Sequence, residues 1–193
     1  MNLSNTTYIS QEEYLNTERL ALDKLEYFDG KVYFRGFKSF AHNEIFANTF
    51  GHIGIDFKGK SLKMFGSDLR IHIPKNTYYC YPEISIYSEE PIAIDDNLDT
   101  ATNPTVLFEI ITPSAQINDQ IVKFELYRAI DSLQEYLMIN SEKVQVLKYS
   151  RNPDNSWLMI VYESLEDVFS IQSIGVELKL SDIYFDVNFK QFD

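Results

Sequence analysis

Val106-Leu107-Phe108-Glu109-Ile110-Ile111 is the stretch of sequence that decides the fold. It is apolar at every position except Glu109, which predicts a central strand with both faces covered by other parts of the chain. Thr112-Pro113-Ser114 ends the stretch, and a helix is predicted from about Asp119 to Ile130. A buried strand followed by a covering helix indicates a layered α/β or α+β domain.

The segments on either side add helices and strands. Ser10-Gln11-Glu12-Glu13 has the form of a capping box that opens a helix through Leu20, and a second helix fits His42 to about Phe50. A hairpin is expected to turn at Asp29-Gly30. Further strands are predicted over residues 61–65, 68–73, 84–87, 135–139, 144–149, 157–162 and 168–173.

Two more expectations concern the strands. In the strand over 68–73, Arg70 and His72 alternate with apolar residues, so that strand is expected to have one solvent-facing side. The whole chain, 1–193, is expected to form a single domain, with the C-terminal strands of 156–193 as an extension of it.

Composition excludes several classes of protein. With 193 residues, 45% of them hydrophobic and 15% aromatic, the chain has the material for a sizeable core and is not a disordered or collagen-like chain. A single cysteine, Cys80, cannot form an internal disulfide, which favours a reducing compartment. The sequence shows no signal peptide and no apolar run that could span a bilayer, so we expect a cytoplasmic protein.

The charge of the chain is unevenly distributed. The net charge of −12 argues against a protein whose whole surface attracts DNA phosphates. Residues 31–75 nevertheless carry eight Lys and Arg against three acids, and residues 76–122 carry no Lys or Arg. This pattern is either chance with a solvated acidic loop at 89–99, or a carboxylate-rich site beside a basic surface.

Glu109 is the first candidate for chemistry. A carboxylate inside an apolar strand needs a cationic partner or a metal ion, so Glu109 is either half of a structural ion pair or a metal ligand. Glu83 begins the preceding strand after Tyr81-Pro82, either as a solvated acid or as a second ligand that converges on Glu109. Mg²⁺ prefers one or two carboxylates completed by water molecules.

Helical spacing adds a basic residue to this pair. Asp119, Lys123 and Tyr127 recur at intervals of four and share one face of the predicted helix. Lys123 then either forms an ordinary surface pair with Asp119 or reaches back toward Glu109. In the second case its ammonium group would orient a water molecule or stabilise developing negative charge.

Several segments together resemble a known family. They are residues 25–33, 41–45, 78–86 and 103–114, followed by Lys123-Phe124-Glu125-Leu126-Tyr127-Arg128 and Ser132-Leu133-Gln134-Glu135-Tyr136. In this order they resemble the Uma-type restriction endonucleases, first catalogued as a domain of unknown function within the PD-(D/E)XK nuclease superfamily. The resemblance covers about residues 10–150. It implies a restriction-endonuclease-like mixed central sheet flanked by helices, here with an extra antiparallel meander.

The resemblance also implies roles for single residues. It assigns the metal to Glu83 and Glu109, and it implies that the catalytic lysine, which the superfamily usually has two residues after the second acid, has moved to Lys123. Glu26 and His42 match polar positions at the edge of the site. Asp119 and Tyr127 accompany Lys123 on its helix face. Glu83 departs from the family, which has Asp after the proline.

Two functions follow as expectations. The first is a nuclease that hydrolyses DNA phosphodiester bonds with Mg²⁺ or Mn²⁺. The alternative is a catalytically weak or inactive nuclease-fold protein that acts as a dimeric binding module, which the net charge and the change from Asp to Glu83 favour. A homodimer is expected in either case. The late strands over 135–173 and the aromatic residues of the tail are candidates for its interface; these residues are Tyr184, Phe185, Phe189 and Phe192.

Overall fold

A six-stranded mixed sheet forms the centre of the molecule in the computed structural model, which describes residues 8–112 and 117–189, with the backbone alone for 117–121. Its strand order is β11-β10-β9-β8-β6-β3. The strands are β3 (Lys63–Gly66), β6 (Ile84–Tyr87), β8 (Val106–Ile111), β9 (Glu135–Asn140), β10 (Val146–Arg151) and β11 (Trp157–Tyr162). β8 pairs in parallel with β9 and antiparallel with β6, so the predicted central strand is confirmed.

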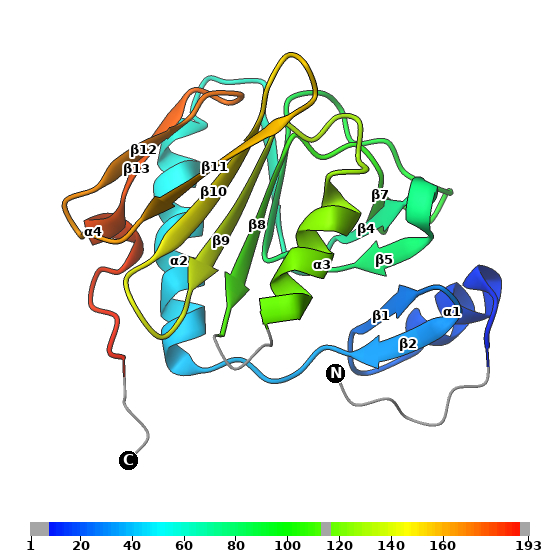
Figure 1. Cartoon of the computed structure of the whole chain (residues 1–193). Helices are drawn as coiled ribbons and strands as arrows, with labels where there is room; N and C mark the ends of the chain where they lie inside the picture. Colours follow the sequence, from blue (N-terminus) through cyan, green and yellow to red (C-terminus); the bar gives the residue numbers. More distant parts are fainter. Residues whose placement is uncertain (1–7, 113–116, 190–193) are drawn as a thin grey trace.

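Helices cover the two faces of this sheet (Figure 1). α2 (Phe40–Asp56) lies on one face with the hairpin of β12 (Val168–Ile171) and β13 (Val176–Lys179) and with α4 (Leu180–Ile183), and α3 (Ile117–Tyr127) lies on the other. Phe108 and Ile110 join the core on the α2 side, and Leu107 joins the core on the α3 side. Because side chains alternate along a strand, Glu109 faces α3.

A second, five-stranded sheet has the order β2-β1-β5-β4-β7. Its strands are β1 (Leu25–Phe28), β2 (Lys31–Phe34), β4 (Arg70–Ile73), β5 (Tyr78–Cys80) and β7 (Thr100–Ala101). The predicted hairpin is confirmed, because Asp29 and Gly30 turn with φ of 47° and 79°. The capping box of Ser10 and Glu13 is also confirmed at α1 (Gln11–Glu18).

The expected solvent-facing side of the strand over 68–73 is wrong at Arg70. Its side chain is 1% exposed and forms ion pairs with Glu18 and Asp99. A buried arginine is tolerated where carboxylates compensate its charge. Both partners are distant in sequence, so the alternation within the strand could not reveal them.

Element boundaries also differ from the expectations. α2 begins at Phe40 rather than His42, because the Ser39 side chain accepts a hydrogen bond from the His42 amide and caps the helix. The short strands β5 and β7 have no clear periodicity and were not predicted. None of the helices in the described residues is long and apolar enough to cross a membrane.

Candidate active site

Glu83 and Glu109 lie beside each other on neighbouring strands, as the sequence predicts. The register of β6 and β8 places Ile84 opposite Phe108, and the Glu83 amide donates to the Phe108 carbonyl oxygen at 2.9 Å. Glu83 is 4% exposed and Glu109 is 3% exposed. Two largely buried carboxylates therefore stand on adjacent strands at one end of the central sheet, where each needs a compensating positive charge.

Glu109 receives that compensation from α3. Its Oε1 atom lies 3.0 Å from Lys123 Nζ and accepts a hydrogen bond of 2.6 Å from the Tyr127 hydroxyl group. The helical spacing therefore brings Lys123 and Tyr127 to the acid. The side chain of Asp119, the third residue on that face, is outside the described residues.

Glu83 is compensated from the segment between β2 and α2. Its Oε1 atom accepts hydrogen bonds of 2.6 Å from both Arg35 Nη2 and Lys38 Nζ, and His42 Nε2 lies 3.0 Å from the same oxygen. Burial by itself would raise the pKa of Glu83. The contact with His42 and the charges of Arg35 and Lys38 outweigh burial and hold this pKa well below its usual range.

Glu26 adds a third carboxylate. It is 7% exposed, and its Oε2 atom accepts a hydrogen bond of 3.0 Å from the Tyr78 hydroxyl group. Burial by itself would lower the pKa of Arg35. The negative charges of Glu83, Glu109 and Glu26 outweigh burial and raise the pKa of Arg35 above its usual value. The predicted supporting residues Glu26 and His42 thus share one electrostatic environment with the two central acids.

Arg35 and Lys38 were not among the residues predicted from the sequence. They lie in a connecting segment, where no strand or helix period indicates the direction of a side chain. The signal that could have found them is the excess of Lys and Arg over residues 31–75. Of the two interpretations of the uneven charge distribution, the carboxylate-rich site beside basic residues is the one that matches the contacts of Arg35 and Lys38 with Glu83.

The two central acids offer a divalent cation a minimal site. Within residues 8–112 and 117–189, no cluster of three or more His, Cys, Asp or Glu residues is arranged to hold a metal. The hydrogen bonds that the described residues donate to Glu83 and Glu109 all end on Oε1, so each acid keeps Oε2 for a cation. Two carboxylates completed by water suit Mg²⁺. Arg35, Lys38 and Lys123 oppose a cation electrostatically, so this donor set fits a metal of modest affinity.

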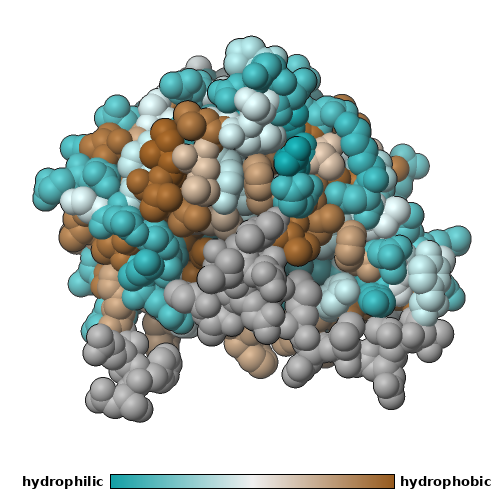
Figure 2. All heavy atoms as spheres, viewed as in Figure 1, coloured by the Kyte–Doolittle hydropathy of each residue, from teal (hydrophilic) through white to brown (hydrophobic). Residues whose placement is uncertain are grey.

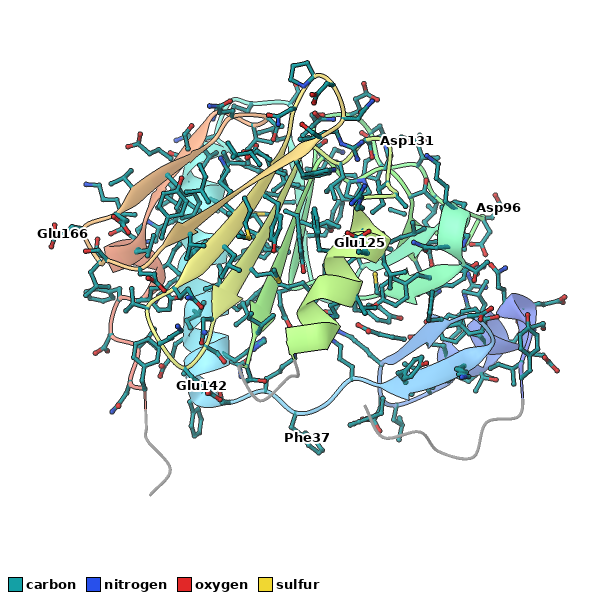
Figure 3. All side chains as sticks on the ribbon, viewed as in Figure 1. Phe37, Asp96, Glu125, Asp131, Glu142 and Glu166 are labelled. Atoms are coloured by element: carbon teal, nitrogen blue, oxygen red, sulfur yellow. The ribbon has the colours of Figure 1, made fainter. Side chains whose placement is uncertain are left out.

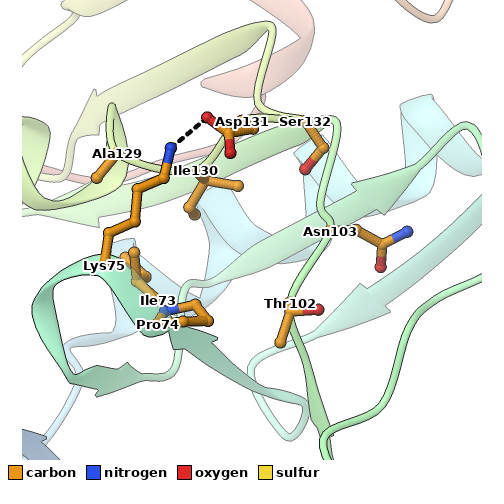
Figure 4. A pocket seen from close by; sticks show the side chains of 9 residues that line it. All are labelled: Ile73, Pro74, Lys75, Thr102, Asn103, Ala129, Ile130, Asp131 and Ser132. Atoms are coloured by element: carbon orange, nitrogen blue, oxygen red, sulfur yellow. Dashed lines mark hydrogen bonds and ion pairs between the residues drawn. The ribbon is translucent and has the colours of Figure 1, made fainter.

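Two hollows lie on the surface around this region. One, of about 200 Å³, is lined by Glu26, Lys123, three aromatic rings and two aliphatic side chains. The other, of about 330 Å³, contains none of the predicted site residues and is bordered by the ion pair of Lys75 and Asp131 (Figure 4). Of these two hollows, only the first is lined by residues of the predicted site, Glu26 and Lys123.

Comparison with known proteins identifies a family. Residues 11–181 match the Uma2 family, described as "Putative restriction endonuclease". Two relatives from Synechocystis sp., the uncharacterized proteins sll1609 and slr1290, are 31% and 32% identical to this chain. The alignments cover 90% and 91% of this chain, and 99% and 91% of the respective relative.

A solved structure shares the fold. The crystal structure of "a putative nuclease belonging to DUF820" from Anabaena variabilis superposes with a TM-score of 0.73 at 18% sequence identity. The match covers 91% of this chain and 97% of that chain. The predicted nuclease-like mixed architecture is therefore confirmed.

Proposed function

Because this chain belongs to the Uma2 family, we propose that it hydrolyses phosphodiester bonds of DNA, with Mg²⁺ or Mn²⁺ held by Glu83 and Glu109. The observation that carries the proposal is that two buried carboxylates stand on adjacent strands, with Lys123 bound to Glu109 and Arg35 in the field of both acids. When bound, the cation would supply a Lewis acid for the phosphate and lower the pKa of a water molecule.

Lys123 serves this reaction as a charged donor. Burial opposes its charge, but Glu109 and Glu26 outweigh burial and raise the pKa of Lys123. Its ammonium group therefore suits stabilisation of developing negative charge. Burial also raises the pKa of Tyr127, so its hydroxyl group remains a donor that fixes Glu109 Oε1 and leaves Oε2 for the cation.

The choice of cation follows from Glu83. Compared with aspartate, glutamate has one more methylene group and one more rotatable bond, so its carboxylate is less closely fixed. Mg²⁺ demands near-ideal octahedral geometry. We therefore expect weaker activity with Mg²⁺ than with Mn²⁺.

The competing function is a binding module that does not cut. One observation favours it: Arg35, Lys38 and His42 all contact the same oxygen of Glu83, so this acid is compensated without a metal. The two functions differ in whether a cation displaces these contacts. Cleavage of DNA that depends on Glu109 decides between them.

The test is a plasmid-cleavage assay with Mg²⁺, with Mn²⁺ and with EDTA. Wild type is expected to cut with Mn²⁺ and to lose activity in EDTA, and Glu109→Gln is expected to be inactive. Glu125→Gln changes an exposed acid on α3 and is the matched control, which should cut like wild type. A folded wild-type protein that cuts no DNA in either metal, or a fully active Glu109→Gln, contradicts the proposal.

We also infer a homodimer through the edge strand β11. Leu158, Met159, Ile160 and Val161 are 40–51% exposed, although consecutive residues of a strand face opposite sides of the sheet. Both faces of this edge are therefore apolar and open. Figure 2 shows hydrophobic atoms gathered over the region where β11 runs in Figure 1.

The backbone of β11 suits pairing with a second copy. The Arg151 amide donates to the Gln134 carbonyl oxygen, on the side away from β11. Arg151 is paired with Trp157 across the β10–β11 ladder, so this is a pair that exchanges no hydrogen bonds. The amide and carbonyl groups of Trp157 therefore point away from β10, and those of Met159 and Val161, two and four residues later, point the same way. An antiparallel copy centred on Met159 would pair all of these groups and bury an edge that otherwise favours aggregation.

Sedimentation analysis tests this dimer. Wild type is expected to sediment as a dimer at micromolar concentration, and Met159→Lys as a folded monomer. Val168→Lys places the same charge at a comparably exposed apolar residue outside β11 and should remain dimeric. A monomeric wild type, or a dimer unaffected by Met159→Lys, contradicts this interface.

A further inference from the structure

Three phenylalanine side chains are exposed on the segment that carries Arg35 and Lys38. Phe34 is 53% exposed, Phe37 is 98% exposed and Phe40 is 86% exposed. Figure 3 shows Phe37 pointing away from the body of the molecule. Large apolar side chains gathered on a surface mark a binding site, because their exposure to water is unfavourable.

The phenylalanines alternate with cations along this segment. The sequence Phe34-Arg35-Gly36-Phe37-Lys38-Ser39-Phe40 places a basic residue after each of the first two rings. Lys38 remains one-third exposed even while it contacts Glu83, so a phosphate in solution can reach it. Aromatic rings interleaved with cations are the usual combination for binding a nucleic-acid strand.

The segment is also tied to the candidate active site. Arg35 and Lys38 contact Glu83, and Ser39 caps the helix that carries His42. A strand lying on the three rings would therefore place a phosphate near the acids. The rest of the chain cannot attract that strand in bulk, because the net charge is −12.

The rings indicate which form of DNA binds. In a duplex the faces of the bases are covered by stacking on their neighbours, whereas unpaired bases present free faces to an aromatic side chain. An exposed ring such as Phe37 can therefore stack on a single strand and not on an intact duplex. This property separates the segment from a surface that contacts only phosphates.

We propose that Phe34 to Phe40 bind single-stranded or locally unpaired DNA, with the phenylalanine rings stacking on bases and Arg35 and Lys38 contacting phosphates. The inference rests on the proposed function and deepens it by naming the form of the substrate. It also gives Arg35 and Lys38 a second partner: contact with a phosphate would draw their positive charges away from Glu83 Oε1 and so favour a cation at this carboxylate.

Fluorescence anisotropy in EDTA tests binding without cleavage. The probes are a fluorescein-labelled single-stranded oligonucleotide and the duplex of the same sequence. Wild type should bind the single strand more tightly, and Phe37→Ala should weaken that binding by roughly 5- to 150-fold, the equivalent of about 1–3 kcal/mol for one stacked base. Phe37→Trp should retain affinity, and Phe185→Ala, at an exposed ring elsewhere, should bind like wild type.

Three results would overturn the inference: equal binding of the duplex and the single strand, unchanged affinity in Phe37→Ala, or Phe37-dependent binding to anionic lipid vesicles with no binding to the oligonucleotide. The plasmid assay is read separately. A protein that cuts DNA without any dependence on Phe37 keeps the proposed function and loses this inference. A protein that binds single strands through Phe37 but cuts nothing keeps this inference and loses the proposed function.

Discussion

Two buried glutamate–lysine pairs lie on adjacent strands of the central sheet. Glu109 on β8 is 3.0 Å from Lys123, and Glu135 on β9 is 2.8 Å from Lys148. Both carboxylates are 3% exposed. By residue type, burial and pairing distance they are equivalent, yet their remaining contacts differ.

Every oxygen of Glu135 is occupied. Oε1 accepts a hydrogen bond from the Gln172 amide in addition to Lys148, and Oε2 accepts from the amide and hydroxyl groups of Ser173. Glu109 uses Oε1 for Lys123 and Tyr127, and no described residue donates to its Oε2. The Lys148 side chain is 7% exposed and that of Lys123 is 22% exposed. A fully satisfied pair suits stability, and an open carboxylate suits ligand binding.

Breaking the satisfied pair should have the largest effect. Glu135→Ala leaves Lys148 buried without its carboxylate, so the free energy of unfolding should fall by about 3–5 kcal/mol. Urea unfolding followed by circular dichroism measures this. Glu125→Ala removes an exposed acid (Figure 3) and should change it by about 0.5 kcal/mol or less. A similarly small change in Glu135→Ala would erase the distinction between the two pairs.

Removing the lysine of the open pair should act on rate instead. Lys123→Ala should lower the rate of DNA cleavage by ~10²–10³, the scale for losing one preorganised electrostatic contact, with no loss of metal affinity, because the charge of Lys123 opposes a cation. Single-turnover cleavage and calorimetry measure the two quantities. An undiminished rate in Lys123→Ala would place Lys123 in the same structural category as Lys148.

The cations at Glu83 should compete with a metal. Arg35→Gln removes a positive charge from this carboxylate, so affinity for Mn²⁺ in the absence of DNA should rise by about tenfold or more. Calorimetric titration measures the affinity, and Arg128→Gln, at an exposed arginine on the surface, is the control. Unchanged or weaker Mn²⁺ binding in Arg35→Gln would mean that the cation does not use Glu83.

Acid should weaken the contacts of Glu83. Its pKa is lower in the folded chain than in the unfolded chain, so its contribution to stability is present above its usual pKa near 4.5 and is lost as the pH falls below that value. Wild type should therefore lose more stability than Glu83→Gln between about pH 5 and pH 3, by up to about 1.4 kcal/mol per pH unit. Parallel slopes for the two proteins would show that Glu83 is not stabilised in its ionised form.

The sequence allowed the open pair to be predicted, but not the satisfied one. Glu109 stands out because every neighbour in its strand is apolar, and the helical spacing that follows brings Lys123 to it. Glu135 stands at the start of its strand, where an acid is unremarkable, and its partners come from β10 and a distant turn. Arg35 and Lys38 were not predicted because they lie in a connecting segment, where the sequence has no helical or strand periodicity to indicate the direction of a side chain. Long-range contacts of this kind are fixed by tertiary packing.

Binding of Mn²⁺ to Glu109→Gln, measured by calorimetry together with urea unfolding, tests the central claim most directly. We expect Mn²⁺ binding to be lost and the free energy of unfolding to stay within about 1 kcal/mol of wild type, because Lys123 can reach water once its partner is neutral. Unchanged Mn²⁺ affinity with a large loss of stability would show that Glu109 is a structural partner of Lys123, as Glu135 is of Lys148.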